Sequence, residues 1–332
     1  ITAVKKENKA IVAPKRMRVT YTLTVDTNAV PAGKLVRCWL PYPRTDQSRQ
    51  RDVKFISASE PEYVLSPQEC RHSTLYMEKR AVQGEPTVFS ETFEYTSCGE
   101  WHNLRAEDVL PYDTTTALYK EYTAEREKHI VFSPRLRELA AKLAAGETNP
   151  YLKAKRIFRW INDHFPWASA REYSSIENIP EYVLDNRHGD CGQVSLLFIT
   201  LCRISGIPAH FQSGFMMHPR AWNLHDWAEV YFEGVGWVPV DQSFGIPAFA
   251  RNADEEYFFL GGIDSWRMIV NTDYGMPLVP EKKYPRSETV DFQRGEVEWE
   301  GGNLYFPQWS YHMDIDYLNY SGMAYSLKTD DV

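Results

Sequence analysis

The chain has 332 residues, of which 43% are hydrophobic, so it is long enough for two or three units that each bury a core. Its formal net charge of −8 and its lack of a basic run argue against a nucleic-acid partner. No stretch approaches the roughly 18 uninterrupted apolar residues of a membrane span, so no membrane-spanning segment is expected.

The first third of the chain has the pattern of antiparallel strands. Runs rich in β-branched and aromatic residues alternate with links that carry Pro, Gly, Asp and Ser. The runs are residues 18–25, 35–40, 53–56, 74–79 and 88–95. They predict an antiparallel β-sandwich-like domain over residues 1–112, which either positions a substrate or serves as a scaffold.

Helical patterns follow from about residue 113. Ser133 is suited to cap a helix whose first residue is Pro134, and Asn149 precedes a second helix that begins at a proline. Trp167 follows these helices and comes just before the segment that leads to Cys191.

Cys191 follows Gly189 and Asp190, which break the chain, and it begins an apolar run of helical length that ends near Cys202. In the first turn of a buried helix, unpaired amides and the positive end of the dipole favour the reactive thiolate. The same amides can hold the oxyanion of a tetrahedral intermediate, and Asp190 is suited to cap the helix. Cys191 is thus a candidate nucleophile, whereas Cys202 is expected to be an inert, buried thiol.

Downstream, residues 225–232 and 236–241 have the composition of two strands, with a glycine-containing turn between them. Folding about that turn brings Asp241 roughly opposite His225. His225 can then accept the thiol proton, and Asp241 can fix its tautomer and stabilise the imidazolium. Each residue alone is more often a packing or turn residue. Together, in this order, they predict a catalytic triad of Cys191, His225 and Asp241.

The region from about residue 150 to 245 resembles the transglutaminase-like superfamily, whose core is a papain-like cysteine fold. The matching segments are GDCGQVSLLFITLCRISGIPAHFQSGF and HDWAEVYFEGVGWVPVD. The resemblance implies an α+β protein with a papain-like transglutaminase core over residues 113–290 and a C-terminal extension, 291–332, packed on that core. It also implies an aromatic side chain that supports the oxyanion. Trp167 fits that position best, with Trp160 or a packing role for Trp167 as the alternatives.

The superfamily contains protein cross-linkers, peptidases, amide hydrolases and inactive members, so the resemblance identifies the core better than the substrate. The preferred interpretation is a cysteine peptidase or amidase that cleaves a peptide or protein-like amide through a thioester. The alternatives are acyl transfer to an amine, as in protein-glutamine transglutaminases, and a non-catalytic binding module. No Asp-x-Asp-x-Asp-Gly calcium loop is present, which disfavours the calcium-activated type. Arylamine acetyltransferases use the same triad but match the pattern less well.

The remaining expectations concern the tail, the cleft and the environment. In the C-terminal part, residues 257–260 and 297–299 are predicted to be short strands. No CxxC or histidine-rich pair has metal spacing, so no metal or cofactor is predicted. The sequence does not decide the pairing of the remaining cysteines, which are Cys38, Cys70 and Cys98. The tryptophans expected to wall a cleft for a peptide-like ligand are Trp167, Trp222 and Trp227.

The chain is expected to be a monomer and to work outside the cytoplasm. It begins at Ile1 rather than methionine, which either a removed leader or a trimmed sequence would explain, and export is the preferred interpretation. We therefore expect a secreted, periplasmic or cell-surface enzyme.

Overall fold

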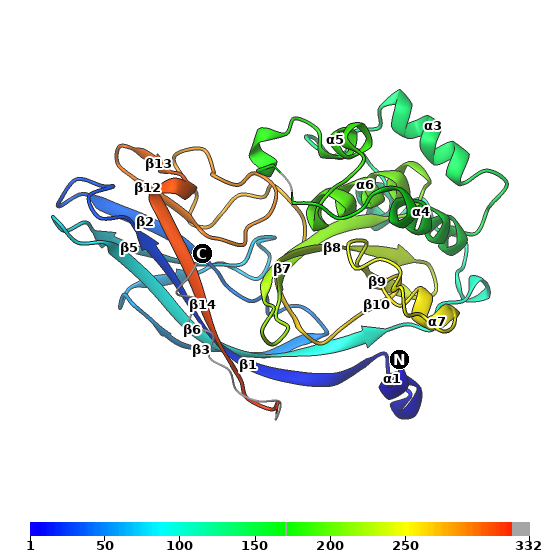
Figure 1. The fold of residues 1–332 in the computed structure, drawn as a ribbon, viewed down its shortest axis with the longest axis horizontal. Helices are drawn as coiled ribbons and strands as arrows, with labels where there is room; N and C mark the ends of the chain where they lie inside the picture. The colour runs from blue at the N-terminus through cyan, green and yellow to red at the C-terminus, as the bar shows by residue number, and fades with distance from the viewer. Residues whose placement is uncertain (170, 321–332) are drawn as a thin grey trace. The chain divides into compact units, whose positions relative to one another are not determined.

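The computed structural model describes residues 1–169 and 171–320 (Figure 1). The protein is α+β with mainly antiparallel sheets, as predicted. Its contacts define two compact units, each discontinuous in sequence. Unit 1 comprises residues 1–12, 99–212 and 225–264, and unit 2 comprises 13–98, 213–224 and the described residues from 265 onward. The predicted divisions after residues 112 and 290 do not coincide with these units.

Unit 2 is built from two antiparallel sheets. One sheet has the order β6-β1-β14 with β3 added to β6, and the other has the order β13-β12-β2-β5-β4. Their bounds are β1 (Ile11–Val25), β2 (Leu35–Pro41), β3 (Gln50–Ala58), β4 (Tyr63–Leu65), β5 (Thr74–Arg80), β6 (Thr87–Trp101), β12 (Glu296–Trp299), β13 (Gly302–Leu304) and β14 (Trp309–Tyr317).

The core of unit 2 follows from the alternation of side chains along these strands. Along β1, every second residue from Met17 to Val25 is fully buried, which is the period of two expected of a strand with one face in a core. Residues from both sheets, among them Trp39 on β2 and Phe93 on β6, join in one hydrophobic cluster. The predicted sheet-rich N-terminal region is therefore confirmed, and each of its five predicted strands is present.

The C-terminal segment completes these sheets. β14 runs antiparallel to β1, from Trp309 opposite Val25 to Tyr317 opposite Met17, and β12 pairs with β2. A short 3-10 helix, η3 (Phe306–Gln308), precedes β14. The described part of the extension expected on the catalytic core thus belongs to unit 2. Local patterns do not reveal strand partners that lie almost 300 residues apart.

Unit 1 contains the helices. They are α1 (Thr2–Glu7), α2 (Ala117–Tyr122), α3 (Pro134–Leu143), α4 (Pro150–His164), α5 (Ile179–Asn186), α6 (Cys191–Ile204) and α7 (Ala253–Glu256), with the 3-10 helices η1 (Ala106–Asp108) and η2 (Tyr173–Ser175). The predicted caps are present, since Ser133 accepts from the Leu136 amide and Asn149 from the Leu152 amide. The helix α6 is almost wholly buried and packs against α3, α4 and α5.

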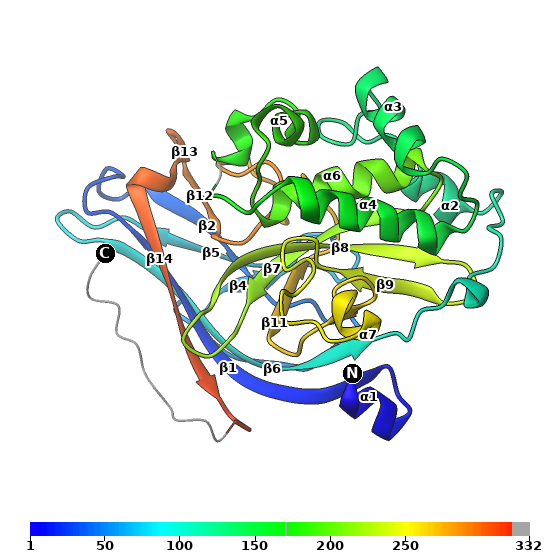
Figure 2. The same ribbon diagram turned by 45° about the vertical axis from the view of Figure 1, so that its right-hand side comes forward.

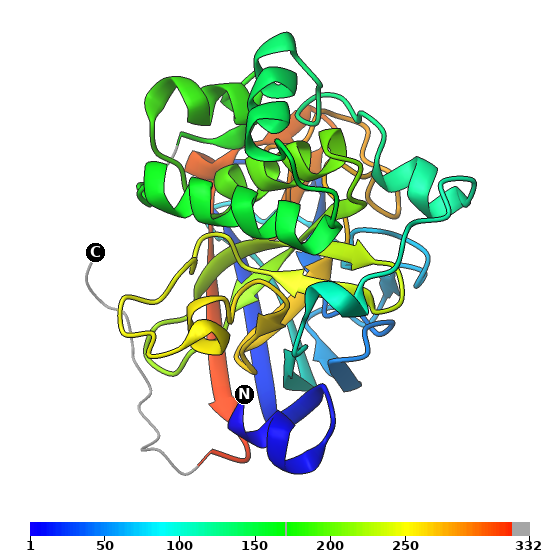
Figure 3. The ribbon, with the colours of Figure 1, turned by 90° about the vertical axis from the view of Figure 1, so that its right-hand side faces the viewer.

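The strands of unit 1 include β8 (Asn223–Phe232) and β9 (Gly236–Val240), which form the predicted hairpin, and β10 (Gly262–Ile263). The helices α4 and α6 lie on one side of this hairpin (Figure 2, Figure 3). The strand β7 (Ala209–Met216) begins in unit 1, and its second half belongs to unit 2, where it pairs with β11 (Arg267–Asn271).

The predicted strand at residues 257–260 is wrong. The chain there turns directly after α7, and Leu260 makes only an isolated bridge to Val240. Asn252 caps α7 and thereby carries the chain through a helical turn before the aromatic run begins. Among the described residues, no helix has both the length and the apolar composition needed to cross a membrane.

Candidate active site

Cys191 is the first residue of α6, as predicted. Asp190 caps the helix, because its Oδ1 accepts a hydrogen bond from the Gln193 amide at 3.1 Å. Gln193 returns the contact, since its Oε1 accepts from the Asp190 amide at 3.3 Å. This reciprocal capping box fixes the start of the helix and, with it, the position of the thiol.

His225 and Asp241 lie in hydrogen-bond contact. The distance from His225 Nε2 to Asp241 Oδ2 is 2.8 Å, and both side chains are buried. The second carboxylate oxygen, Asp241 Oδ1, accepts from the Phe244 amide at 3.0 Å, so both oxygens are held. In the hairpin, Ala228 pairs with Val240, which places Asp241 just beyond the strand and diagonal to His225 rather than directly opposite.

The thiol of Cys191 lies against the strand that carries the histidine. Cys191 Sγ donates to Asp226 Oδ2 at 3.4 Å, and Asp226 is the residue after His225 on β8. The hydroxyl of Tyr173, on η2, lies 3.2 Å from the same Asp226 oxygen and 2.6 Å from Asp190 Oδ1. The structure therefore brings Cys191 to the residue beside His225, and it brings His225 to Asp241.

Asp226 and Tyr173 were not predicted to take part in the site. For Asp226 a signal existed, because a carboxylate directly before the apolar residues Trp227 and Ala228 of a predicted strand requires a partner if it is buried. Tyr173 follows the helical region in a segment without periodicity, so no local pattern pointed to it. Its role emerges only from the folded contacts.

The electrostatics of the thiol differ from the prediction. Burial raises the pKa of the Cys191 thiol well above its usual value, and the carboxylates of Asp226 and Asp190 raise this pKa further. The expectation that the helix start favours the thiolate is thus wrong for the resting site. The partial charge of the helix end is smaller than the opposing effect of desolvation and two nearby carboxylates.

The amides of the first turn of α6 are largely engaged. The Gly192 amide donates to the Tyr173 hydroxyl at 3.2 Å, and the Gln193 amide donates to Asp190. An oxyanion at this helix end would therefore use the Cys191 amide before the next two. The predicted set of oxyanion donors is smaller than expected because the capping box already uses part of it.

Trp167 lies beside the segment that leads to Cys191. Its backbone forms a parallel bridge with Gly189, two residues before Cys191, and its side chain is 61% exposed. The alternative, Trp160, is on α4, where it stacks on His164 with ring centroids 4.9 Å apart. The bridge to Gly189 ties the backbone of Trp167 to the segment before Cys191, and the role of Trp167 at the oxyanion stays a prediction.

The other predicted wall residues have different positions. Trp227 is fully buried and donates its indole N–H to Gln212 at 2.6 Å, so the expectation that it walls a cleft is wrong. Trp222 packs against the hydrophobic cluster of unit 2. Phe244 is an aromatic neighbour that was not predicted, with 38% of its surface exposed and its ring edge-on to His225 at 5.2 Å.

The other cysteines carry no disulfide. All five cysteines of the chain are free thiols, and Cys38, Cys98 and Cys202 are buried. Burial raises the pKa of the Cys202 thiol well above its usual value, which is consistent with an inert thiol. Across residues 1–169 and 171–320, no group of three or more His, Cys, Asp or Glu side chains is arranged to hold a metal ion.

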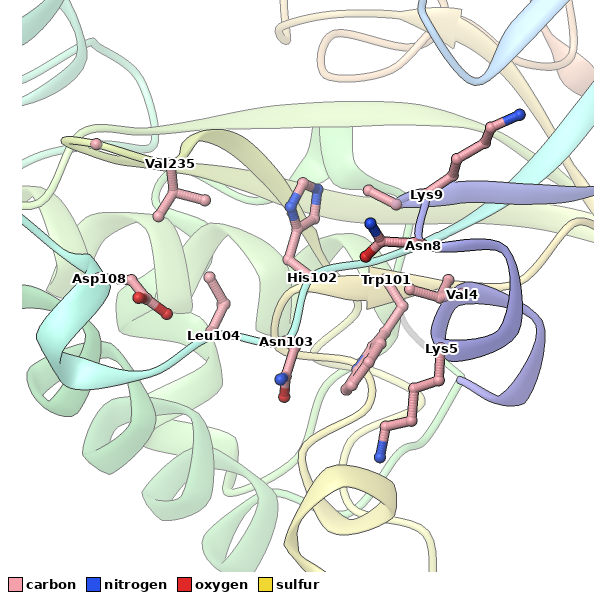
Figure 4. A pocket seen from close by; sticks show the side chains of 12 residues that line it. Val4, Lys5, Asn8, Lys9, Trp101, His102, Asn103, Leu104, Asp108 and Val235 are labelled. Carbon is pink, nitrogen blue, oxygen red and sulfur yellow. The ribbon is translucent and has the colours of Figure 1, made fainter.

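A separate pocket of about 710 Å³ lies between α1 and the segment after Trp101 (Figure 4). Lys5 points into it, lies over the Trp101 ring at 5.5 Å, and pairs with Asp254 at 2.7 Å. The residues that line this pocket do not include the cysteine, the histidine or the carboxylates described above. The pocket is therefore distinct from the candidate active site.

Residues 137–242 match the family model of the transglutaminase-like superfamily. The chain carries a transglutaminase-like core. This core contains Cys191, His225 and Asp241, and it lies mostly within unit 1. The resemblance drawn from the sequence segments around the cysteine and the histidine is thereby confirmed.

The proteins similar to this chain include two curated relatives and one solved structure. An uncharacterized protein of Haemophilus influenzae is 24% identical over 259 residues, which cover 67% of this chain and 68% of that protein. A protein-glutamine gamma-glutamyltransferase of Pseudomonas aeruginosa is 23% identical over 125 residues. That match covers 34% of this chain and 19% of the relative, so the chain spans about a fifth of its length.

The solved structure is a protein of Cytophaga hutchinsonii that was proposed to be a cysteine protease. It covers 95% of each chain with a TM-score of 0.60 and 15% sequence identity. At this identity the likeness establishes the fold, and it extends beyond the transglutaminase-like core to the sheets of unit 2.

Proposed function

We propose that the transglutaminase-like core is a cysteine hydrolase, a peptidase or amidase that acts on a peptide or protein-like amide. One observation carries the proposal. The strand β8 presents His225, held by Asp241 at 2.8 Å, and its next residue contacts the Cys191 thiol at 3.4 Å. A nucleophile, a base and an orienting carboxylate are the groups that acyl transfer through a thioester requires.

In the proposed reaction, the thiol proton passes from Cys191 Sγ to His225 Nδ1, since Nε2 of that ring is bound to Asp241. The sulfur attacks the carbonyl carbon of the amide, and the C–N bond breaks as the amine takes the proton from the imidazolium. Water then attacks the thioester carbonyl and returns a proton to Cys191 through His225. Because burial and the nearby carboxylates raise the pKa of the Cys191 thiol, we expect proton transfer to accompany the attack.

Two further groups are assigned roles in this proposal. The Cys191 amide and the Trp167 indole N–H would donate to the oxyanion of the tetrahedral intermediate. Phe244, exposed and edge-on to His225, would contact the substrate beside the scissile bond. An apolar or aromatic side chain of the substrate at this position is expected to favour binding.

Acyl transfer to an amine is the alternative for which a specific observation exists. Within the matched 125 residues, the chain is similar to a protein-glutamine gamma-glutamyltransferase. Transfer and hydrolysis use the same thioester and differ in whether an amine or water attacks it. The same active-site geometry therefore supports both reactions.

Intact-mass spectrometry of protein and substrate would test the proposal. The protein is incubated with a glutamine-containing peptide library, with and without methylamine. Backbone cleavage indicates a peptidase, a gain of about one mass unit indicates side-chain hydrolysis, and a methylamine adduct indicates transfer. We expect a hydrolytic product that Cys191→Ala abolishes and that Cys70→Ser, a change in unit 2, leaves unchanged.

No product with any peptide, together with tight binding of one of them, would favour a non-catalytic module and contradict the proposal. Location outside the cytoplasm belongs to the proposal as well. Fractionation of the producing cell tests it, and recovery of the protein with the cytoplasmic fraction alone would contradict it.

A further inference from the structure

A carboxylate occupies the place next to the nucleophile. Asp226 is 2% exposed, and its Oδ2 accepts a hydrogen bond from the Cys191 thiol at 3.4 Å. The Tyr173 hydroxyl lies 3.2 Å from the same oxygen. These contacts place the carboxylate of Asp226 directly at the sulfur that must lose its proton in the proposed reaction.

The Tyr173 hydroxyl connects the polar groups around the Cys191 thiol. A phenol has a single proton to donate, and its shorter contact, 2.6 Å, is with Asp190 Oδ1. The hydroxyl also accepts from the Gly192 amide at 3.2 Å. The Tyr173 hydroxyl thereby holds Asp190, Asp226 and the first turn of α6 together beside the sulfur.

The neighbouring elements contribute the other ionisable groups around the thiol. Asp190 caps α6, and Tyr173 begins η2. The strand β8 contributes His225 and Asp226, and Asp241 follows β9. Three of these five groups are carboxylic acids, and the histidine is bound to one of them. The charge that faces the sulfur therefore comes mainly from carboxylates, and Asp226 is the one that touches it.

We propose that Asp226 is a positioning residue that holds Cys191 as the neutral thiol in the resting enzyme. Its carboxylate fixes the thiol by accepting its hydrogen bond, and its charge opposes formation of the thiolate. Tyr173 in turn fixes the carboxylate. The proposal rests on the proposed role of Cys191 as nucleophile.

The same arrangement explains why the restraint does not block catalysis. The thioester has no charge on sulfur, so Asp226 opposes the free thiolate without opposing the acyl-enzyme. Proton transfer to His225 in step with attack avoids a free thiolate altogether. The enzyme would thus be poorly reactive toward electrophiles that need a preformed thiolate, while amide substrates held in the site still react.

Alkylation of Cys191 by iodoacetamide tests this role without any substrate. Rates are measured by intact mass from pH 5 to 10 in the wild type and in Asp226→Asn, which keeps the size of the side chain and removes its charge. We expect at least about tenfold faster alkylation at pH 7 and an inflection of the rate profile at least one pH unit lower. Asp190→Asn is the matched control, since asparagine caps helices equally well, and it should give a smaller change because Asp190 does not bond the thiol.

Equal alkylation rates in wild type and folded Asp226→Asn would overturn the proposal. Slower alkylation would overturn it too, because it would identify Asp226 as the proton acceptor of the thiol. If the variant does not unfold cooperatively, the wild-type profile decides. An inflection above about 8.5, the usual value for a free thiol, supports the role, and an inflection at or below that value contradicts it. Alkylation needs no turnover, so a failure of the hydrolase proposal would leave this result intact and separately readable.

Discussion

Each unit of the molecule contains a fully or nearly fully buried carboxyl group, and the two are stabilised in different ways. In unit 1, Asp241 accepts hydrogen bonds from His225 and from the Phe244 amide. In unit 2, Glu91 on β6 is 1% exposed, and neither of its oxygens has a hydrogen-bond partner in the described structure. Burial raises the pKa of Glu91 well above its usual value.

The difference shows that hydrogen-bond donors, and not burial alone, determine whether a buried carboxyl group is suited to orient a histidine. An ionised carboxylate is tolerated inside a protein when donors surround it, and otherwise it takes up a proton. Asp241 is provided with a histidine and an amide, so it can remain charged and orient the imidazole. Glu91 has no such donors in the described structure, so burial favours its protonated form, and a charge there would raise the pKa values of Tyr21, Cys38 and Tyr42.

The largest effect is expected in unit 1, at Cys191. Cys191→Ala should lower turnover of any peptide substrate by at least about 10³-fold, because it removes the group that forms the thioester. The unfolding midpoint should stay close to that of the wild type, since the alanine still begins α6. Turnover measured by mass spectrometry, with circular dichroism as the folding control, checks both points. Retained turnover would remove Cys191 from the mechanism.

A second large effect is expected for the partner of the histidine. Asp241→Asn keeps the shape but loses the charge that stabilises the imidazolium, so kcat should fall by about 10²- to 10⁴-fold with a smaller change in KM. Asp254→Asn, a carboxylate of the same unit that pairs with Lys5 instead, is the matched control and should change kcat little. A rise in KM at constant kcat would indicate that Asp241 only shapes the binding surface.

Local sequence patterns were sufficient to predict the helix and the hairpin that contain the candidate site residues. The glycine and aspartate ahead of Cys191 marked the start of α6, and the glycine-containing turn after Phe232 marked the hairpin. These features depend on residues close in sequence, where capping and turn preferences act. The contact between His225 and Asp241 followed from that hairpin, although the register proved diagonal.

The parts that could not be predicted depend on contacts between distant segments. The pairing of β14 with β1 joins residues almost 300 positions apart, and no local pattern encodes that partner. The charge at the thiol likewise comes from Tyr173 on η2 and Asp226 on β8, which meet Cys191 only in the folded unit. The helix start predicted a favoured thiolate because its own dipole is local, whereas the opposing carboxylate is not.

A smaller effect, on stability, is expected when an added methyl group crowds Tyr173 and Asp226 beside Cys191. In Gly192→Ala, the added Cβ would lie 2.6 Å from Asp226 Oδ2 and even closer to the Tyr173 hydroxyl. Alanine gains about 1 kcal/mol over glycine in a helix, but overpacking typically costs about 1–3 kcal/mol, so the variant should be destabilised. The control is Ser195→Ala on the same helix, whose buried hydroxyl has no hydrogen-bond partner and whose loss should be neutral or stabilising. Urea unfolding of both variants compares them, and equal stability of Gly192→Ala and the wild type would show that the cluster can shift aside.

The smallest effect is expected for Glu91 in unit 2, and the pH dependence of stability tests it. The pKa of Glu91 is raised in the folded state, so its contribution is fully present below the unfolded pKa and is lost as the pH rises through the folded pKa. Glu91→Gln cannot ionise, so at pH 8 it should raise the thermal midpoint by about 2–8 °C, the shift expected from about 1–2 kcal/mol, and by less at pH 5.

Glu94, on the same strand, provides the control of opposite sign. Hydrogen bonds from Arg18 and Arg16 lower the pKa of Glu94, so its contribution is present above the unfolded pKa and lost as the pH falls. Glu94→Gln should therefore lower the midpoint at pH 8 and change it less in acid. Calorimetric scans of the wild type and both variants at pH 5 and pH 8 give the six midpoints needed. If Glu91→Gln lowered the midpoint at pH 8 as Glu94→Gln is expected to do, Glu91 would have to be charged and stabilised by its surroundings. The contrast between Glu91 and Asp241 would then fail.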